Sequence, residues 1–104
     1  MAAMAVLRDP KDAETRAIHE LVAFVGADVL EVGCGDGRLT WCYAERTRSV
    51  LALDPEAAAI EQARASLAHL PKQLRQSITF QVADITSANL PAEAFDVIVL
   101  AWSL

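Results

Sequence analysis

Cysteine is scarce in this chain, and long apolar segments are missing. Only two of its 104 residues are cysteines, Cys34 and Cys42, and they form neither a CxxC pair nor a disulfide framework. No apolar run approaches the roughly 20 residues that a membrane-spanning helix needs. The apolar start, Met1–Leu7, lacks the basic segment and the cleavage pattern of a signal peptide. We therefore expect a cytoplasmic protein with no part in the membrane.

Basic residues are in the minority. Nine Lys and Arg residues stand against 14 Asp and Glu residues, which gives a formal net charge of −5 at pH 7. Because binding to a nucleic-acid backbone needs a basic patch, and the charges here are interspersed, a nucleic-acid partner is not favoured. The two histidines, His19 and His69, lie far apart in the sequence without other metal-binding residues nearby, so we expect no metal site.

The remaining composition supports one small folded domain. Apolar residues make up 54% of the chain, which argues against disorder. Asp9-Pro10 is typical of an N-cap and a first helical residue, and apolar residues then recur at helical spacing as far as Gly26. We expect an N-terminal helical segment within residues 1–26 and a separate sheet-forming domain over residues 27–104.

After Gly26, short apolar segments alternate with helical ones. Strands are expected at Val29–Val32, Ser49–Leu53, Ser77–Val82 and Phe95–Leu100, and helices from Arg38 to about Arg46 and from Pro55 to about Leu70. This alternation predicts an α/β fold, a parallel sheet with helices on both faces. Ligands of such sheets bind outside the carboxyl ends of the strands, and each of the first three strands here ends in a polar or glycine-rich element.

The first of these elements is the run Gly33-Cys34-Gly35-Asp36-Gly37, two residues after Glu31. Glycines let the backbone turn sharply and approach a ligand closely. A carboxylate at Glu31 would repel a pyrophosphate but would attract an ammonium or sulfonium group. The pattern thus favours a cationic, zwitterionic ligand over a dinucleotide, whose GxGxxG fingerprint would require glycine at Arg38.

The other two elements are acidic. Asp54 ends the second strand, where a carboxylate can accept hydrogen bonds from ribose hydroxyls, although it can also cap the helix that opens at Pro55. Asp84 and Ile85 follow the third strand, where a carboxylate can accept from an exocyclic amine and an isoleucine can cover a purine. Together the three elements describe a nucleoside with a positively charged amino-acid tail.

Four segments resemble the motifs of a known family. Residues 29–40, V-L-E-V-G-C-G-D-G-R-L-T, are similar to the first motif of class I S-adenosylmethionine-dependent methyltransferases, acid-x-Gly-x-Gly-x-Gly. Residues 51–54, 82–85 and 95–100 look like the second, third and fourth motifs, in the same order and spacing. The resemblance covers roughly residues 26–104. It implies the N-terminal, cofactor-binding portion of a Rossmann-like fold, truncated after the fourth strand.

The resemblance assigns the glycine loop to the methionine part of the cofactor, S-adenosylmethionine. Gly33 and Gly35 would pass beneath it, with the backbone of Cys34 in the same loop. Glu31 would hold the amino end of the cofactor directly or through water. The resemblance implies an adenosine site as well. Asp54 would bind the ribose hydroxyls, and Pro55 would lie beside the adenosine.

The third and fourth motifs complete the implied site. Asp84 would accept from the adenine amine, Ile85 would lie against the ring, and the backbone near Ala101 would line the pocket at the end of the fourth strand. The following residues, 101–104, lack the Asn/Asp-Pro-Pro-aromatic signature of relatives that methylate exocyclic amines of bases or glutamine. A small-molecule acceptor is therefore expected, and the catalytic residues stay unknown.

Two other functions stay open, a non-catalytic methyltransferase-like module that binds the nucleoside and an NAD(P)-binding oxidoreductase domain.

We expect the four strands in the spatial order three-two-one-four, with the outer edge of the fourth unpaired. The chain alone should then be inactive and should self-associate through that edge. Four further residues are expected in local roles. Arg38 should be solvated or paired locally, and not bound to the cofactor carboxylate. Asp96 should order the start of the last strand, and Trp41 and Tyr43 should pack.

Overall fold

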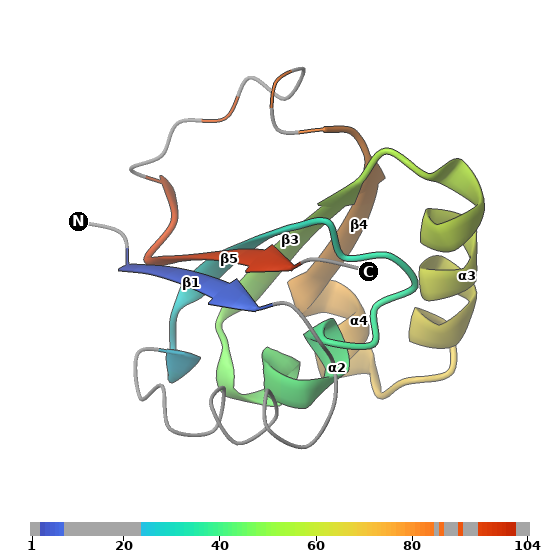
Figure 1. Cartoon of the computed structure of the whole chain (residues 1–104). Helices are drawn as coiled ribbons and strands as arrows, with labels where there is room; N and C mark the ends of the chain where they lie inside the picture. The colour runs from blue at the N-terminus through green and yellow to red at the C-terminus, as the bar shows by residue number, and fades with distance from the viewer. Residues whose placement is uncertain (1–2, 8–23, 85, 87–89, 91–93, 102–104) are drawn as a thin grey trace.

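The computed structural model describes residues 3–7, 24–84, 86, 90 and 94–101. These residues form one sheet of five strands, all pairs of which are parallel: β1 (Ala3–Leu7), β2 (Asp28–Val32), β3 (Ser49–Asp54), β4 (Ile78–Val82) and β5 (Val97–Ala101). Their spatial order is β1-β5-β2-β3-β4 (Figure 1). The α/β class, the four predicted strands and their order three-two-one-four are thus confirmed.

Strand β1 was not predicted, and it corrects one expectation. It pairs with β5 along its whole length, from Ala3 beside Val97 to Leu7 beside Ala101. The outer edge of β5 therefore has a strand partner, and the predicted unpaired edge was wrong. The self-association expected from that edge loses its physical basis, because the backbone N–H and C=O groups that would have recruited another chain are already paired.

The helices of the described residues are shorter than the sequence suggested. Helix α2 (Thr40–Tyr43) continues as the 3-10 helix η2 (Ala44–Arg46), and α3 covers Ala57–Leu67. Helix α4 (Lys72–Ser77) was not predicted: the expected helix ended at about Leu70, and no helix was placed after Pro71. A proline is equally compatible with the start of a helix, where its fixed φ is favourable and no N–H is needed.

The helix expected before Gly26 lies outside the described residues except for its last part. Phe24 to Gly26 form a turn, and Gly26 adopts a φ of 68°. This left-handed conformation fits the predicted stop at that glycine.

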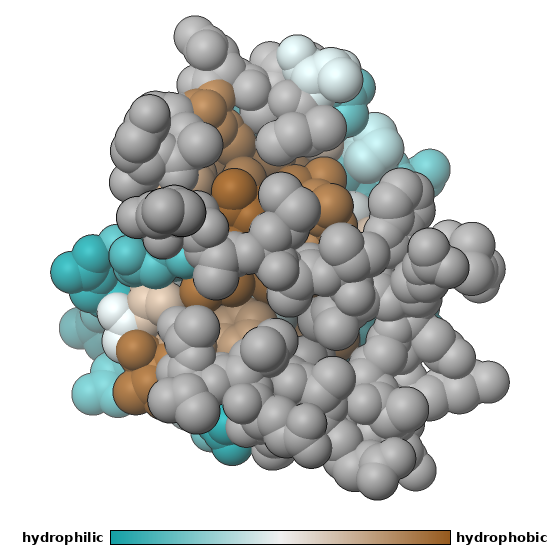
Figure 2. Space-filling view, turned by 60° about the vertical axis from the view of Figure 1, so that its left-hand side comes forward, coloured by the Kyte–Doolittle hydropathy of each residue, from teal (hydrophilic) through white to brown (hydrophobic). Residues whose placement is uncertain are grey.

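One face of the sheet carries the core. Parallel pairing places two rows of side chains on this face, Val97-Val29-Val50-Ile78 and Val99-Glu31-Ala52-Phe80. All eight residues are buried, and seven of them are apolar. On the side of the molecule seen in Figure 2, the described apolar residues gather toward the middle and the hydrophilic ones toward the margins. Glu31 is the exception in the buried rows.

The amino ends of the strands are tied by polar contacts. Asp96 N donates to Asp28 O at 2.8 Å, and Asp28 N donates to Asp96 Oδ2 at 2.9 Å, which confirms that Asp96 orders the start of β5. The Asp28 carboxylate accepts from Arg48 and, at 2.6 Å, from Ser49 Oγ. These donors lower the pKa of Asp28 to about 2.

At the opposite end, the chain leaves β2 through a tight turn. Gly33 has a φ of 83°, and its N–H donates to Leu53 O at 2.8 Å, as does Cys34 N at 3.0 Å. A Cβ atom at Gly33 would collide with the carbonyl oxygen of Ala101, whereas one at Gly35 would meet nothing within 4 Å. The loop therefore crosses the carboxyl ends of β3 and β5 at a distance that only glycine permits.

This difference between two glycines gives a first prediction. Gly35→Ala should lower the free energy of unfolding by about 1 kcal/mol, the cost of a left-handed conformation. Gly33→Ala should cost roughly 2–4 kcal/mol, because overpacking is added to the same backbone cost. Urea denaturation of both variants measures the two losses. Equal losses would show that the close approach to Ala101 contributes nothing.

Candidate functional site

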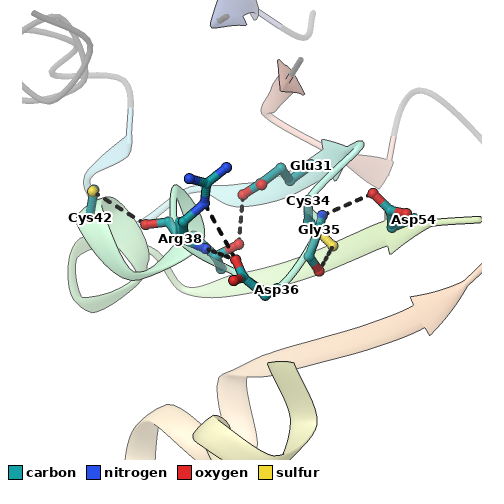
Figure 3. Close-up of polar contacts among 8 residues, drawn as sticks. Glu31, Cys34, Gly35, Asp36, Arg38, Cys42 and Asp54 are labelled. Carbon is teal, nitrogen blue, oxygen red and sulfur yellow. Dashed lines mark hydrogen bonds and ion pairs between the residues drawn. The ribbon is translucent and has the colours of Figure 1, made fainter. Parts of the chain in front are cut away.

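Four of the predicted site residues, Glu31, Cys34, Gly35 and Asp54, lie near one another at the carboxyl ends of β2 and β3 and in the glycine loop (Figure 3). Asp54, the last residue of β3, connects that loop to the next helix. Gly35 N donates to its Oδ2 at 2.9 Å, and Glu56 N donates to its Oδ1 at 2.8 Å. The capping role considered for Asp54 is wrong, because α3 begins at Ala57 with Glu56 as its N-cap and has no side-chain cap bond. Asp54 instead holds the turn ahead of α3 through the N–H of Glu56. Each carboxylate oxygen accepts one of the two hydrogen bonds, which leaves a lone pair on each for a ligand.

Glu31 lies on the buried face of the sheet and is completely inaccessible. Thr40 Oγ1 donates to its Oε1 at 2.9 Å, and the hydroxyl of Tyr43 donates to the same oxygen. Its other oxygen, Oε2, is buried and has no hydrogen-bond partner among the residues that the structure describes. A buried acceptor without a partner costs free energy, so this oxygen is the one polar atom of the site that calls for an explanation.

Burial dominates the ionisation of this cluster. It raises the pKa of Glu31 to about 7, against the opposing hydrogen bonds from Tyr43 and Thr40 and together with the negative charge of Asp54. Burial, followed by the charge of Glu31, also raises the pKa of the Cys34 thiol and of the Tyr43 hydroxyl. Tyr43 therefore remains a hydrogen-bond donor at neutral pH, and Cys34 is not a thiolate nucleophile.

Of the remaining predicted site residues, Ala101 lies closest to the loop, with its carbonyl oxygen against Gly33. Pro55 is exposed directly after Asp54. Asp84 is exposed one strand farther out, after β4, and accepts from Thr86 Oγ1 at 2.6 Å. Ile85 lies outside the described residues. The structure thus brings the glycines, Glu31, Asp54 and Ala101 together, with Asp84 along the same edge of the sheet.

Thr40 and Tyr43 are the site residues that the sequence analysis did not identify. Tyr43 was expected only to pack, and it does stack on Phe24 with ring centroids 4.6 Å apart, but its hydroxyl also bonds Glu31. A signal existed in the sequence. The two residues are spaced by three on the helix after the loop, so they share a face, and a buried acid requires donors.

The neighbouring residues behave as expected. Arg38 is exposed and pairs with Asp36, with 3.6 Å between Nε and Oδ1, which confirms local pairing. Trp41 packs edge-on against Phe80 at a centroid distance of 5.5 Å.

Within the described ranges, no three His, Cys, Asp or Glu side chains are grouped so that they could hold a metal ion. None of the helices described here is long and apolar enough to cross a membrane.

The burial of Glu31 predicts a pH-dependent stability. Its folded pKa of about 7 exceeds the ordinary 4.5, so the ionised form favours unfolding. The protonated Glu31 carboxyl group contributes fully to the free energy of unfolding below pH 4.5. This contribution, about 3 kcal/mol, is lost as the pH rises through 7. Between about pH 5 and 8, wild-type stability should fall more steeply than that of Glu31→Gln. Urea denaturation of wild type and Glu31→Gln at about pH 5 and pH 8 measures the two decreases in stability. Parallel pH dependences of the two proteins would contradict the prediction.

Comparison with known proteins identifies the family. A family model described as a methyltransferase domain matches residues 29–104. An uncharacterized methyltransferase of Mycobacterium tuberculosis is 39% identical over 71 residues, which are 68% of this chain and 33% of that protein. An uncharacterized methyltransferase of Anoxybacillus flavithermus is 31% identical over 96 residues, 92% of this chain and 42% of that protein. The chain thus spans between a third and a half of the length of these relatives.

A solved structure agrees with this result. Phosphoethanolamine N-methyltransferase 1 of Haemonchus contortus, in complex with phosphoethanolamine and S-adenosylhomocysteine, is 27% identical with a TM-score of 0.70. The similarity covers 86% of this chain and 18% of that one. Since the family model matches more than half of the chain and the fold agrees, the chain belongs to the methyltransferase-domain family, the class I S-adenosylmethionine-dependent methyltransferases.

Proposed function

We propose that this chain is the cofactor-binding part of an enzyme that transfers a methyl group from S-adenosylmethionine to a small molecule. The observation that carries the proposal is Glu31, a buried acid beside the glycine loop with one oxygen unpartnered among the described residues. S-adenosylmethionine supplies an electrophilic methyl group on a sulfonium and carries an ammonium group that such an oxygen would attract. A dinucleotide offers its loop an anionic pyrophosphate instead.

The free space over the glycine loop supports this proposal. A Cβ atom at Gly35 would meet nothing within 4 Å, so open space lies above the loop at this position. Gly33 and Gly35 are proposed to pass beneath the methionine part of the cofactor, with the backbone of Cys34. Glu31 is proposed to hold its amino end. The protein's contribution would be largely positioning and exclusion of water.

The adenosine would extend along the carboxyl edge of the sheet. Asp54 is proposed to bind the ribose hydroxyls with the lone pairs that its bonds to Gly35 and Glu56 leave free, and Pro55 to lie beside the adenosine. Asp84 is proposed to accept from the adenine amine, with Ile85 against the ring. Ala101 would line the pocket at the end of β5. The exposure of Asp84 and Pro55 supports their access to a ligand.

A small-molecule acceptor is supported by the Haemonchus structure, which was solved with phosphoethanolamine. A location in the cytoplasm is supported by Cys34 and Cys42, both of which are free thiols.

The second candidate function is a module that holds the cofactor without turnover. It rests on the same site, and transfer of label from S-adenosylmethionine by the full-length protein would separate the two.

The first test is ligand choice. S-adenosylhomocysteine should bind to the chain, and NAD should not, because Glu31 lies beside the loop and Arg38 stands where a dinucleotide site needs glycine. Isothermal titration calorimetry with both ligands measures the preference. Binding of NAD in place of S-adenosylhomocysteine would refute the proposed function.

The second test is Asp54→Ala. It should weaken S-adenosylhomocysteine binding by about 1.5–3 kcal/mol, the range for hydrogen bonds to a charged group, and Asp54→Asn should lose less. The matched control is Asp36→Ala, which removes a loop carboxylate that bonds only locally in Figure 3. Circular dichroism verifies the fold of each variant. An unchanged affinity in a folded Asp54→Ala protein would show that this residue only holds the loop and the turn ahead of α3.

A further inference from the structure

The hydrogen bonds of Glu31 are distributed unevenly over its carboxyl group. Thr40 and Tyr43 both donate to Oε1, whereas Oε2 has no partner among the described residues. A buried acid that served only to hold a helix against the sheet would be satisfied best by one donor on each oxygen. The observed arrangement instead fixes the orientation of the carboxyl group and leaves one oxygen unused.

Both donors are held rigidly by one helix. Thr40 and Tyr43 are fully buried on α2, and Tyr43 is stacked on Phe24. Helix α2 follows the glycine loop after only two residues, so the path of the loop sets the position of both hydroxyl groups. The loop that would receive a ligand and the donors that orient Glu31 are therefore one continuous segment.

We propose that Thr40 and Tyr43 are positioning residues for the cofactor, which occupy Oε1 of Glu31 so that Oε2 accepts a hydrogen bond from the ammonium group of the cofactor. This inference rests on the proposed function, and it adds to the site two residues that follow the glycine run of residues 33–37. The ammonium group would satisfy the one buried oxygen that the described residues leave unsatisfied.

The surroundings of Glu31 make this arrangement sensitive to pH. Burial raises its pKa, the two hydroxyl donors lower it, and the negative charge of Asp54 raises it, with a result of about 7. From the loop, Cys34 faces it as a neutral thiol, and from β5 the paired residue is the apolar Val99. None of these neighbours carries a positive charge. A bound ammonium group favours the ionised carboxylate, so affinity should increase as the pH rises through 7.

The test is the affinity for S-adenosylhomocysteine as a function of pH, measured by calorimetry on the 104-residue chain. Thr40→Val and Tyr43→Phe each remove one donor to the ionised form while preserving shape. Each should move the midpoint of the pH profile upward by about one unit. Thr40→Ser restores a hydroxyl and should return the midpoint toward the wild-type value. Thr47→Val is the matched control, because its hydroxyl bonds Ala44 O at 2.8 Å and not Glu31.

A second measurement follows the proton that binding releases. Titrations of the wild-type chain near pH 6.5, in two buffers of different ionisation enthalpy, should show that binding releases more than roughly half a proton. Glu31→Gln should abolish both this release and the pH dependence. Circular dichroism confirms that each variant is folded.

The possible outcomes distinguish a failure of this inference from a failure of the proposed function. Wild-type affinity without a pH dependence near 7, or affinity losses in Thr40→Val and Tyr43→Phe with no shift of the midpoint, would overturn the inference and leave the proposed function intact. A wild-type chain that binds no S-adenosylhomocysteine at any pH would overturn the proposed function and this inference with it.

Discussion

The arrangement of this protein depends on one buried carboxyl group. Glu31 occupies a row of the sheet that is otherwise built from Val99, Ala52 and Phe80, where an apolar side chain would be more stable. Its presence requires donors, and α2 supplies them from Thr40 and Tyr43. The helix, the loop before it and the strand beneath it are thus bound to each other through a single oxygen. Such a costly placement is typical of a functional site, where stability is sacrificed for a pre-arranged charge.

A second carboxylate, that of Asp54, also holds several segments together, at the carboxyl edge of the sheet. Asp54 accepts from the backbone of Gly35 in the loop and from Glu56 ahead of α3. Its backbone carbonyl also accepts from Ala83 N at 3.0 Å, after β4. The segments that follow β2, β3 and β4 are therefore all hydrogen-bonded to Asp54. A ligand lying across this edge would meet a surface whose parts are fixed relative to one another before it arrives, which reduces the entropic cost of binding.

The sequence was informative where local patterns and burial agree. The strands β2, β3 and β5 are largely apolar, and β4 alternates buried Ile78 and Phe80 with exposed Thr79 and Gln81, so short apolar patterns were enough to predict all four. The resemblance to the family then predicted their spatial order. The pairing of Glu31 with Thr40 and Tyr43 could not be read in the same way. The hydroxyl groups of Thr40 and Tyr43 reach Glu31 only because of where α2 packs on the sheet, and this packing is a feature of the tertiary structure that a local pattern does not reveal. Helix α4 was missed for a local reason, since Pro71 is compatible with both an end and a beginning.

Strand β1 has a consequence for the order in which the sheet forms. Its residues, Ala3–Leu7, pair with Val97–Ala101, so nearly the whole chain separates the two partners. Closing such a loop is entropically expensive until the strands between have assembled, which makes this pairing a late event and slows folding as contact order rises. During synthesis β1 is made well before β5, so it cannot form this pairing until β5 has followed. The interval between the two is the one in which a chaperone would be of most use to this strand.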